Sequence, residues 1–206
     1  MSILHAVALL VLLVDDSDKG WKEAAKEDGI TVYSRARPDT TVAEMKAIGI
    51  MDAAPIEIWK SLRDYDAYPK TMPYTDEAKV VSTEGGGKVI ILYSVVNAPV
   101  VDRRDYCIRI LDESDGKGMM MESWKASDAC GPDKEGLVRV KVNDGYWKLE
   151  PRDNGTRTFA TYYVFTDPGG AIPKWLANKA NSTAVPNVFA AIRKVIAGKR
   201  AEAQKK

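Results

Sequence analysis

The sequence predicts an α+β fold in which a curved antiparallel β-sheet packs against one long C-terminal α-helix. Residues 78–166 contain a series of apolar runs separated by glycine-rich turns, which is typical of consecutively connected antiparallel strands. Residues 172–197 keep apolar side chains at near-helical spacing. The chain has 206 residues, of which 45% are hydrophobic and 29% charged, so it can form one domain with a sizeable core.

The first 73 residues predict short helices and strands in alternation. The expected elements are, in order, a helix over 21–28 ended by Gly29, a strand that opens at Ile30 and closes before Pro38, a strand over 42–51, a helix over 55–62, and a loop or short helix over 64–73. Proline is well accommodated in the first turn of a helix, so the helix over 55–62 is expected to begin at Pro55.

Six strands are expected in the middle of the chain. They cover 78–83, 88–97, 104–111, 119–126, 138–149 and 156–166. Within 104–111 the residues alternate, so Tyr106, Ile108 and Ile110 share one face of the strand and residues 105, 107 and 109 share the other. The closing helix over 172–197 contains Pro186, which removes one backbone hydrogen bond and is expected to kink the helix.

Composition excludes several kinds of chemistry. The single histidine, His5, lies in an apolar N-terminal run, so neither a Ser-His-Asp triad nor a multi-histidine metal site is expected. The two cysteines, Cys107 and Cys130, form no Cys-x-x-Cys pair, which argues against zinc and dithiol redox chemistry. We therefore expect no cofactor, and the formal net charge of +1 gives no indication of a nucleic-acid partner.

The charge is unevenly distributed along the chain. Residues 171–206 contain eight basic residues and one acidic residue, so the rest of the chain is acidic. This segment can orient the protein on an anionic surface, or it can simply be a solvated helix with a lysine-rich tail. We divide the chain into an N-terminal segment (1–19), a main domain (20–198) and a basic tail (199–206).

The N-terminal segment is expected to direct the protein to a membrane or out of the cytoplasm. Its apolar run, 3–14, is shorter than the roughly 20 residues that span a bilayer and suits the apolar part of a signal peptide. An incomplete signal, an uncleaved anchor and a helix buried against the domain are the three alternatives. We expect a periplasmic or secreted protein, membrane-anchored if the segment is retained, with a cytoplasmic location as the alternative. In an exported protein Cys107 and Cys130 could pair.

Motifs along most of the chain resemble one known family. They are Trp21 with 28–33 (DGITVY), Asp64-Tyr65 and Tyr68 before Met72-Pro73, Tyr93-Ser94 with 97–99 (NAP), 102–106 (DRRDY), Trp124, 145–151 (GYWKLEP), and Tyr162 followed by 167–178 (DPGGAIPKWLAN). Taken together and in this order, over residues 20–198, they resemble the START family, the lipid-transfer domains related to the steroidogenic acute regulatory protein. We expect a stand-alone bacterial member.

The resemblance implies a helix-grip fold with an internal apolar cavity that binds one lipid, such as a sterol or a phospholipid, without catalysis. The sequence departs from the family pattern at Thr71, where a tryptophan usually precedes Met-Pro, and at Ile110, where several lipid-transferring members place an arginine in the cavity. If Ile110 faces the cavity, that buried charge is missing and a less polar ligand is favoured.

The resemblance also suggests which residues contact the ligand. The expected cavity residues are Met72, Tyr93, Tyr106, Ile110, Trp124, Trp147, Tyr162, Leu176, Val188, Phe189 and Ile192, although the same residues could form an ordinary packed core. Pro99, Val100 and Val101 form an apolar loop that is expected to touch a membrane surface transiently.

The sequence is also consistent with two other functions. Related helix-grip proteins include aromatase/cyclases that act on polyketides, in which case Arg109, Tyr106 or Tyr162 would be the acid–base candidates. The third alternative is a regulatory protein with a collapsed cavity that binds another protein.

Overall fold

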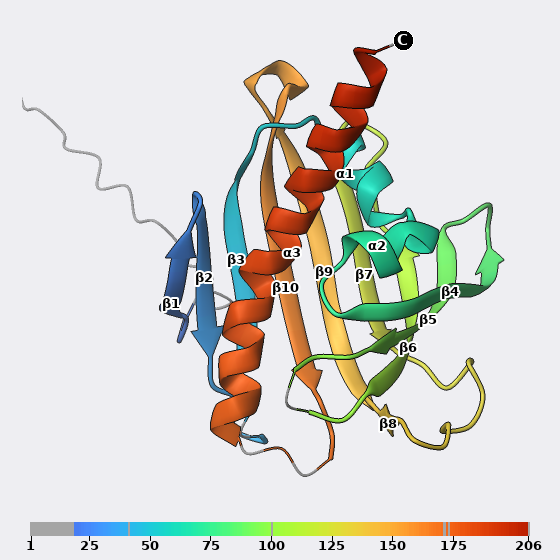
Figure 1. Ribbon diagram of the computed structural model, residues 1–206. Helices are drawn as coiled ribbons and strands as arrows, with labels where there is room; N and C mark the ends of the chain where they lie inside the picture. The colour runs from blue at the N-terminus through green and yellow to red at the C-terminus, as the bar shows by residue number, and fades with distance from the viewer. Residues whose placement is uncertain (1–18, 41, 100, 171, 173, 206) are drawn as a thin grey trace, which may run out of the picture.

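The structure, a computed structural model, describes residues 19–40, 42–99, 101–170, 172 and 174–205, without the side chains of residues 174–183. The expected α+β helix-grip fold is confirmed: a large curved sheet wraps around one long helix, α3 (Lys174–Ala203), which crosses its concave face (Figure 1). Three sequence predictions lie outside the described residues. They concern the apolar run 3–14, Val100 and the side chain of Leu176.

The sheet contains ten strands, and the short helices α1 (Pro55–Leu62) and α2 (Tyr68–Thr71) contact α3. The strands are β1 (Lys22–Glu27), β2 (Ile30–Arg35), β3 (Glu44–Met51), β4 (Thr75–Glu84), β5 (Val89–Val96), β6 (Arg104–Asp112), β7 (Met120–Ala126), β8 (Val138–Arg139), β9 (Val142–Arg152) and β10 (Arg157–Asp167). The other short helices are η2 (Tyr65–Ala67) and η3 (Asp153–Gly155).

The order of the strands confirms the expected consecutive connections in the middle of the chain, because β4, β5, β6, β7, β9 and β10 are neighbours in that order. The order is β1-β2-β3-β10-β9-β7-β6-β5-β4, with β8 pairing in parallel with β6 at the side of this path. The pairing of β3 with β10 joins the N-terminal strands to the last one, and the expected strand over 138–149 is divided between β8 and β9. The sequence did not indicate the pairing of β3 with β10 or the parallel pairing of β8, because both join segments that are distant in the chain.

The expected helix over 21–28 is wrong, because this segment forms edge strand β1. It pairs with β2 from Glu27 opposite Ile30 to Lys22 opposite Ser34. Asp28 and Gly29 connect the two strands, and both have positive φ, at 46° and 75°. An Asp-Gly pair between two strands favours this tight hairpin turn, so the sequence carried a signal for the hairpin.

The C-terminal half of helix α3 is attached to both the sheet and α1. Phe189 and Ile192 are fully buried between the helix and the sheet. Arg200 donates to both carboxylate oxygens of Glu57 on α1, at 2.8 and 2.7 Å, and Lys199 pairs with Asp64 at 3.0 Å. The helix extends to Ala203, beyond the expected end at residue 197, and continues on both sides of Pro186. Two of the C-terminal bases are therefore engaged within the molecule.

Across the ranges that the structure describes, no helix is both long enough and apolar enough to cross a membrane.

Candidate functional site: an internal cavity with one polar end

A cavity of about 190 Å³ lies between the sheet and α3. Its walls come from helical segments on one side and from six strands on the other. The lining residues are Leu62, Tyr65, Tyr68, Met72, Pro73, Thr75, Leu92, Val96, Tyr106, Ile108, Ile110, Glu122, Trp124, Asn143, Trp147, Tyr162 and Val188. Most of these side chains are aliphatic or aromatic, which suits an apolar ligand.

Strand alternation accounts for the sheet side of the cavity. Tyr106, Ile108 and Ile110 on β6 all line it, as their shared face predicts. Neighbouring strands add residues in register with them, because Leu92 on β5 lies opposite Ile108 and Trp124 on β7 lies opposite Ile110. Ile110 therefore occupies the cavity position at which several members of the resembled family have an arginine.

Aromatic rings form a continuous wall from the strands to α3. The rings of Trp147 and Tyr162 lie 4.5 Å apart between centroids, and Tyr162 also stacks with Trp124 at 6.0 Å. Behind this wall, Phe189 on α3 packs against Trp147 at 5.0 Å. A side chain at Gly145 would displace Trp124, since a Cβ there would lie 2.2 Å from the Trp124 Cζ2 atom. The glycine thus makes room for the tryptophan ring.

One end of the cavity is polar and is formed by Glu122, Tyr65 and Tyr68. Glu122 is 4% exposed and Tyr65 is 5% exposed. The Glu122 Oε2 atom and the Tyr65 hydroxyl have no hydrogen-bond partner within the described part of the chain, whereas the Tyr68 hydroxyl donates to the Leu62 carbonyl at 2.5 Å. Buried polar groups are usually paired, so two unpaired ones in one cavity are unusual.

The nearest cation is already paired with another acid. Arg63 lies 3.0 Å from the Asp112 carboxylate and also donates to the Gly87 carbonyl at 2.5 Å. Burial raises the pKa of Glu122 to about 7. The positive charge of Arg63 lowers this pKa, but the negative charge of Asp112 cancels part of that effect. Burial, with a further contribution from the charge of Glu122, also raises the pKa of Tyr65 above its ordinary value, and the nearby Arg63 guanidinium offsets this only in part.

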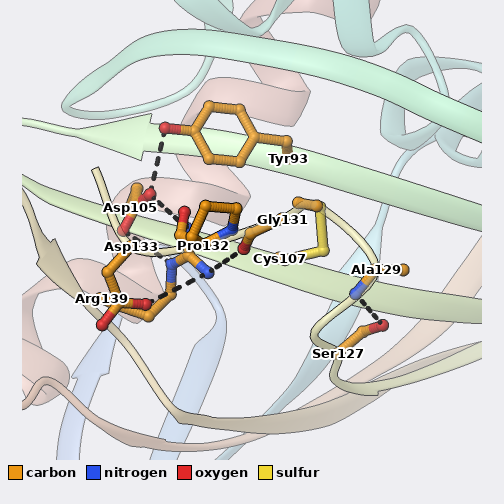
Figure 2. Close-up of polar contacts among 10 residues, drawn as sticks. Tyr93, Asp105, Cys107, Ser127, Ala129, Gly131, Pro132, Asp133 and Arg139 are labelled. Atoms are coloured by element: carbon orange, nitrogen blue, oxygen red, sulfur yellow. Dashed lines mark hydrogen bonds and ion pairs between the residues drawn. A yellow bond between two sulfur atoms is a disulfide. The ribbon is translucent and has the colours of Figure 1, made fainter.

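The opposite face of the sheet carries a polar network that holds a loop in place (Figure 2). Arg139 donates to both carboxylate oxygens of Asp105 at 2.9 Å, and the Tyr93 hydroxyl donates to the same carboxylate at 3.1 Å. Cys107, on the same strand as Asp105, forms a disulfide with Cys130 on the loop, with Cα atoms 5.8 Å apart. Burial by itself raises the pKa of Asp105, but the hydrogen bonds from Arg139 and Tyr93 outweigh it and hold the pKa below its ordinary value.

The structure brings most of the expected ligand-contact residues into the cavity wall. These are Met72, Tyr106, Ile110, Trp124, Trp147, Tyr162 and Val188. Phe189 and Ile192 are buried in the core beneath α3 and do not line the cavity.

The structure contradicts the expectation that Tyr93 lines the cavity, because its side chain points to the other face of the sheet. It lies opposite Cys107 in the register of β5 and β6, whereas the cavity residues of β6 lie opposite the residues on either side of Tyr93. Its ring is covered instead by the ammonium group of Lys134, 3.8 Å from the ring centroid. The face of Tyr93 depends on strand register, which its own sequence segment does not determine.

The polar end of the cavity was not anticipated from the sequence. Glu122 stands two residues before Trp124 on the same strand, so period-two alternation places both side chains on one face. That spacing was the available indication for Glu122. Tyr65 carries no comparable indication, since it lies in the 3-10 turn η2 between α1 and α2.

The expected membrane loop follows β5 at the edge of the cavity. Val96 lines the cavity, and the Asn97 N–H donates to the Tyr74 carbonyl at 2.8 Å, next to the cavity residue Pro73. Pro99 is exposed and Val101 is half-buried. Tyr74 is itself 45% exposed, so an aromatic side chain lies on the surface beside this loop.

Comparisons with known proteins found similarity over most of the chain. The model of the START domain family matches residues 3–201. An uncharacterized protein of Pseudomonas aeruginosa is 33% identical over 180 residues, which are 84% of this chain and 85% of that protein. The phosphatidylcholine transfer protein of Rattus norvegicus is 29% identical over 174 residues, which are 81% of this chain and 79% of that protein.

Solved structures agree with this assignment. A STAR-related lipid transfer protein from Xanthomonas axonopodis has a TM-score of 0.78 and 28% identity, covering 86% of this chain and 98% of its own. The Zhui aromatase/cyclase from Streptomyces, at 16% identity and a TM-score of 0.50, covers 79% of this chain and 95% of its own and shares the fold alone. With its family match, its sheet and helix, and its internal cavity, the chain belongs to the START domain family.

Proposed function

We propose that this protein binds one lipid molecule in its internal cavity and transfers it between membranes without catalysing a reaction. The observation that carries the proposal is the cavity itself, which lies between an apolar and aromatic sheet face and α3. The relationship to proteins named for phosphatidylcholine transfer and STAR-related lipid transfer supports the same function.

Lipid entry requires the cavity wall to move. The cavity volume of about 190 Å³ is below the roughly 300–1,000 Å³ of typical ligand pockets. The Arg200–Glu57 pair attaches α3 near its C-terminal end, and Pro186, earlier in the helix, removes one backbone hydrogen bond. We therefore propose that α3 bends at Pro186 and that this movement opens the cavity.

Transfer of a fluorescent phospholipid or sterol between vesicles tests the function. Val188→Trp fills the cavity from α3, and Lys194→Trp adds the same side chain at an exposed position of the same helix. The expected result is transfer by the wild type and by Lys194→Trp, with loss of transfer in Val188→Trp. Equal transfer by all three proteins would contradict a role of the cavity, and no transfer by any would contradict the carrier function.

The loop of Pro99, Val100 and Val101 is proposed to contact the membrane during transfer. The support is its apolar composition and its attachment beside the cavity residues Val96 and Pro73. Apolar side chains at an exposed loop tip are unusual outside interaction sites. Val100→Asp combined with Val101→Asp is expected to slow transfer from anionic vesicles while leaving the unfolding midpoint unchanged; an unchanged transfer rate would contradict the proposal.

We also propose that the protein works in an oxidising compartment, periplasmic or extracellular. The pairing of Cys107 with Cys130 supports this, because disulfides persist in such compartments and are rare in the cytosol. Alkylation of accessible thiols in cell fractions tests it. The expected result is unlabelled cysteines in protein from the exported fraction, and fully labelled protein found only in the cytosol would contradict it.

A further inference from the structure

The unpaired acid in the cavity indicates what kind of headgroup the site accepts. Glu122 projects from β7, with Asp112 opposite it on β6 and Trp147 opposite it on β9. Asp112 takes up the neighbouring cation, Arg63, at 3.0 Å, so no ion pair to that guanidinium is recorded for Glu122. A buried carboxyl group without a counter-charge is stabilised in its neutral form, which can both donate and accept a hydrogen bond.

Tyr65 provides a second unpaired group at the same end of the cavity. Its hydroxyl is buried and makes no hydrogen bond of standard geometry within the described residues, although the Arg63 guanidinium is close enough to lower its pKa; the hydroxyl of Tyr68, by contrast, donates to the Leu62 carbonyl. The influence of Glu122 on the pKa of Tyr65 indicates that the two groups lie within electrostatic reach of each other. Each of them lacks a partner that a ligand could provide.

We propose that Glu122 and Tyr65 together bind the hydroxyl group of an uncharged lipid, so that the cavity selects such lipids over those with a phosphate headgroup. The inference rests on the proposed function and narrows its ligand class. A hydroxyl group donates one hydrogen bond and accepts others, so one ligand oxygen can serve both residues. A quaternary ammonium group has no hydrogen to donate and would leave Tyr65 unpaired.

The charges around the cavity disfavour a phosphate group. The described lining residues include no lysine or arginine, and their one carboxylic acid, Glu122, would repel an anion when ionised. On β6, Arg109 is exposed on the opposite face of the sheet, and the buried Arg104 does not line the cavity but donates to the carbonyl oxygens of Pro168 and Asp102. Phosphate recognition usually relies on arginine or lysine, and the described wall offers neither.

Three lipids that have the same acyl chains and differ only in their headgroups test the effect of the headgroup on binding. Dioleoylglycerol carries a free hydroxyl, dioleoylphosphatidic acid carries an anionic phosphate, and dioleoylphosphatidylcholine carries a phosphate with a quaternary ammonium group. Each is titrated against the full chain in competition with a fluorescent lipid, and each complex is counted by native mass spectrometry. We expect dioleoylglycerol to bind at least about tenfold more tightly than either phospholipid, as loss of a buried hydrogen bond and charge repulsion would each contribute.

Variants of Glu122 separate the chemistry from the packing. Glu122→Gln keeps the shape and the hydrogen-bonding capacity without a charge, and is expected to bind dioleoylglycerol within about threefold of the wild type. Glu122→Leu removes the partner and is expected to weaken binding by about tenfold. Tyr65→Phe is expected to weaken it by about threefold. The matched control is Glu113→Leu, which removes an exposed acid near the same pair of strands.

The outcomes are distinct for the two proposals. If no lipid binds to the wild type at all, the carrier function fails. If lipids bind but the phospholipids match dioleoylglycerol, or if Glu122→Leu binds as well as the wild type, the carrier function stands and the headgroup inference is overturned. If Glu122→Gln is as defective as Glu122→Leu, the site requires a charged carboxylate and the preference for an uncharged lipid is wrong. The wild-type comparison remains decisive even if Glu122→Leu does not fold.

Discussion

The buried acid in the cavity makes a prediction about how stability depends on pH. The ordinary pKa of a glutamate is 4.5, and burial raises that of Glu122 to about 7 in the folded protein. Below pH 4.5 the carboxyl group is protonated in both the folded and the unfolded chain. Between 4.5 and 7 the unfolded chain loses the proton first, so rising pH favours unfolding, and above 7 the full cost is present.

The magnitude follows from the size of the shift. A difference of about 2.5 pKa units between the two states corresponds to about 3 kcal/mol of unfolding free energy, to within a factor of about two. Glu122→Gln removes this titration and keeps the shape of the side chain. We therefore expect Glu122→Gln to gain stability relative to the wild type as pH rises from 4.5 to 8, by about 3 kcal/mol in total.

Urea unfolding followed by tryptophan fluorescence measures this difference at half-unit steps from pH 4.5 to 8. Titrations of other groups, such as Asp105, occur in both proteins and cancel in the comparison. Glu113→Gln, at an exposed position, is the control and is expected to follow the wild type. If the curves for wild type and Glu122→Gln stay parallel across the whole range, Glu122 is not an uncompensated buried acid, and the reasoning about the cavity fails.

Three further predictions concern the framework around the cavity. Replacing Cys107 and Cys130 by alanine is expected to cost about 3 kcal/mol, because their disulfide closes a segment with a sequence separation of 23, and urea unfolding with and without reductant measures this. Asp105→Ala leaves the guanidinium that binds it without its anion, and urea unfolding is expected to show a loss of about 3–5 kcal/mol. Gly145→Ala forces Trp124 out of position, and it is expected to cost about 1–3 kcal/mol and to change the near-ultraviolet circular dichroism.

The strands and the inner face of the sheet could largely be predicted from the sequence, because alternation is a local property. Tyr106, Ile108 and Ile110 share a face whatever their neighbours are, and the structure places all three in the cavity wall. The helix over Pro55–Leu62 was equally accessible, since proline at its first turn and its apolar spacing both lie within a few residues.

Features that depend on pairing between distant segments could not be predicted. The face of Tyr93 is determined by its register opposite Cys107, and β1 is a strand because β2 provides its hydrogen-bond partners. The unpaired state of Glu122 depends on Arg63 being engaged by Asp112, which involves three separate elements.

Charge counting had a similar limit. The basic C-terminal segment suggested a cationic surface, but Arg200 binds Glu57 and Lys199 binds Asp64, so part of its charge is neutralised within the fold. A count along the chain includes these residues as free charges, because their acidic partners lie more than one hundred residues away in sequence.

The central claim is that the cavity holds one lipid, and native mass spectrometry of the protein purified from its own host tests it most directly. The predicted result is a mass increment of one lipid per chain, recovered by organic extraction and greatly reduced in Val188→Trp. A protein without such an increment, which also fails to take up sterol, diacylglycerol or phospholipid from vesicles, would contradict the claim.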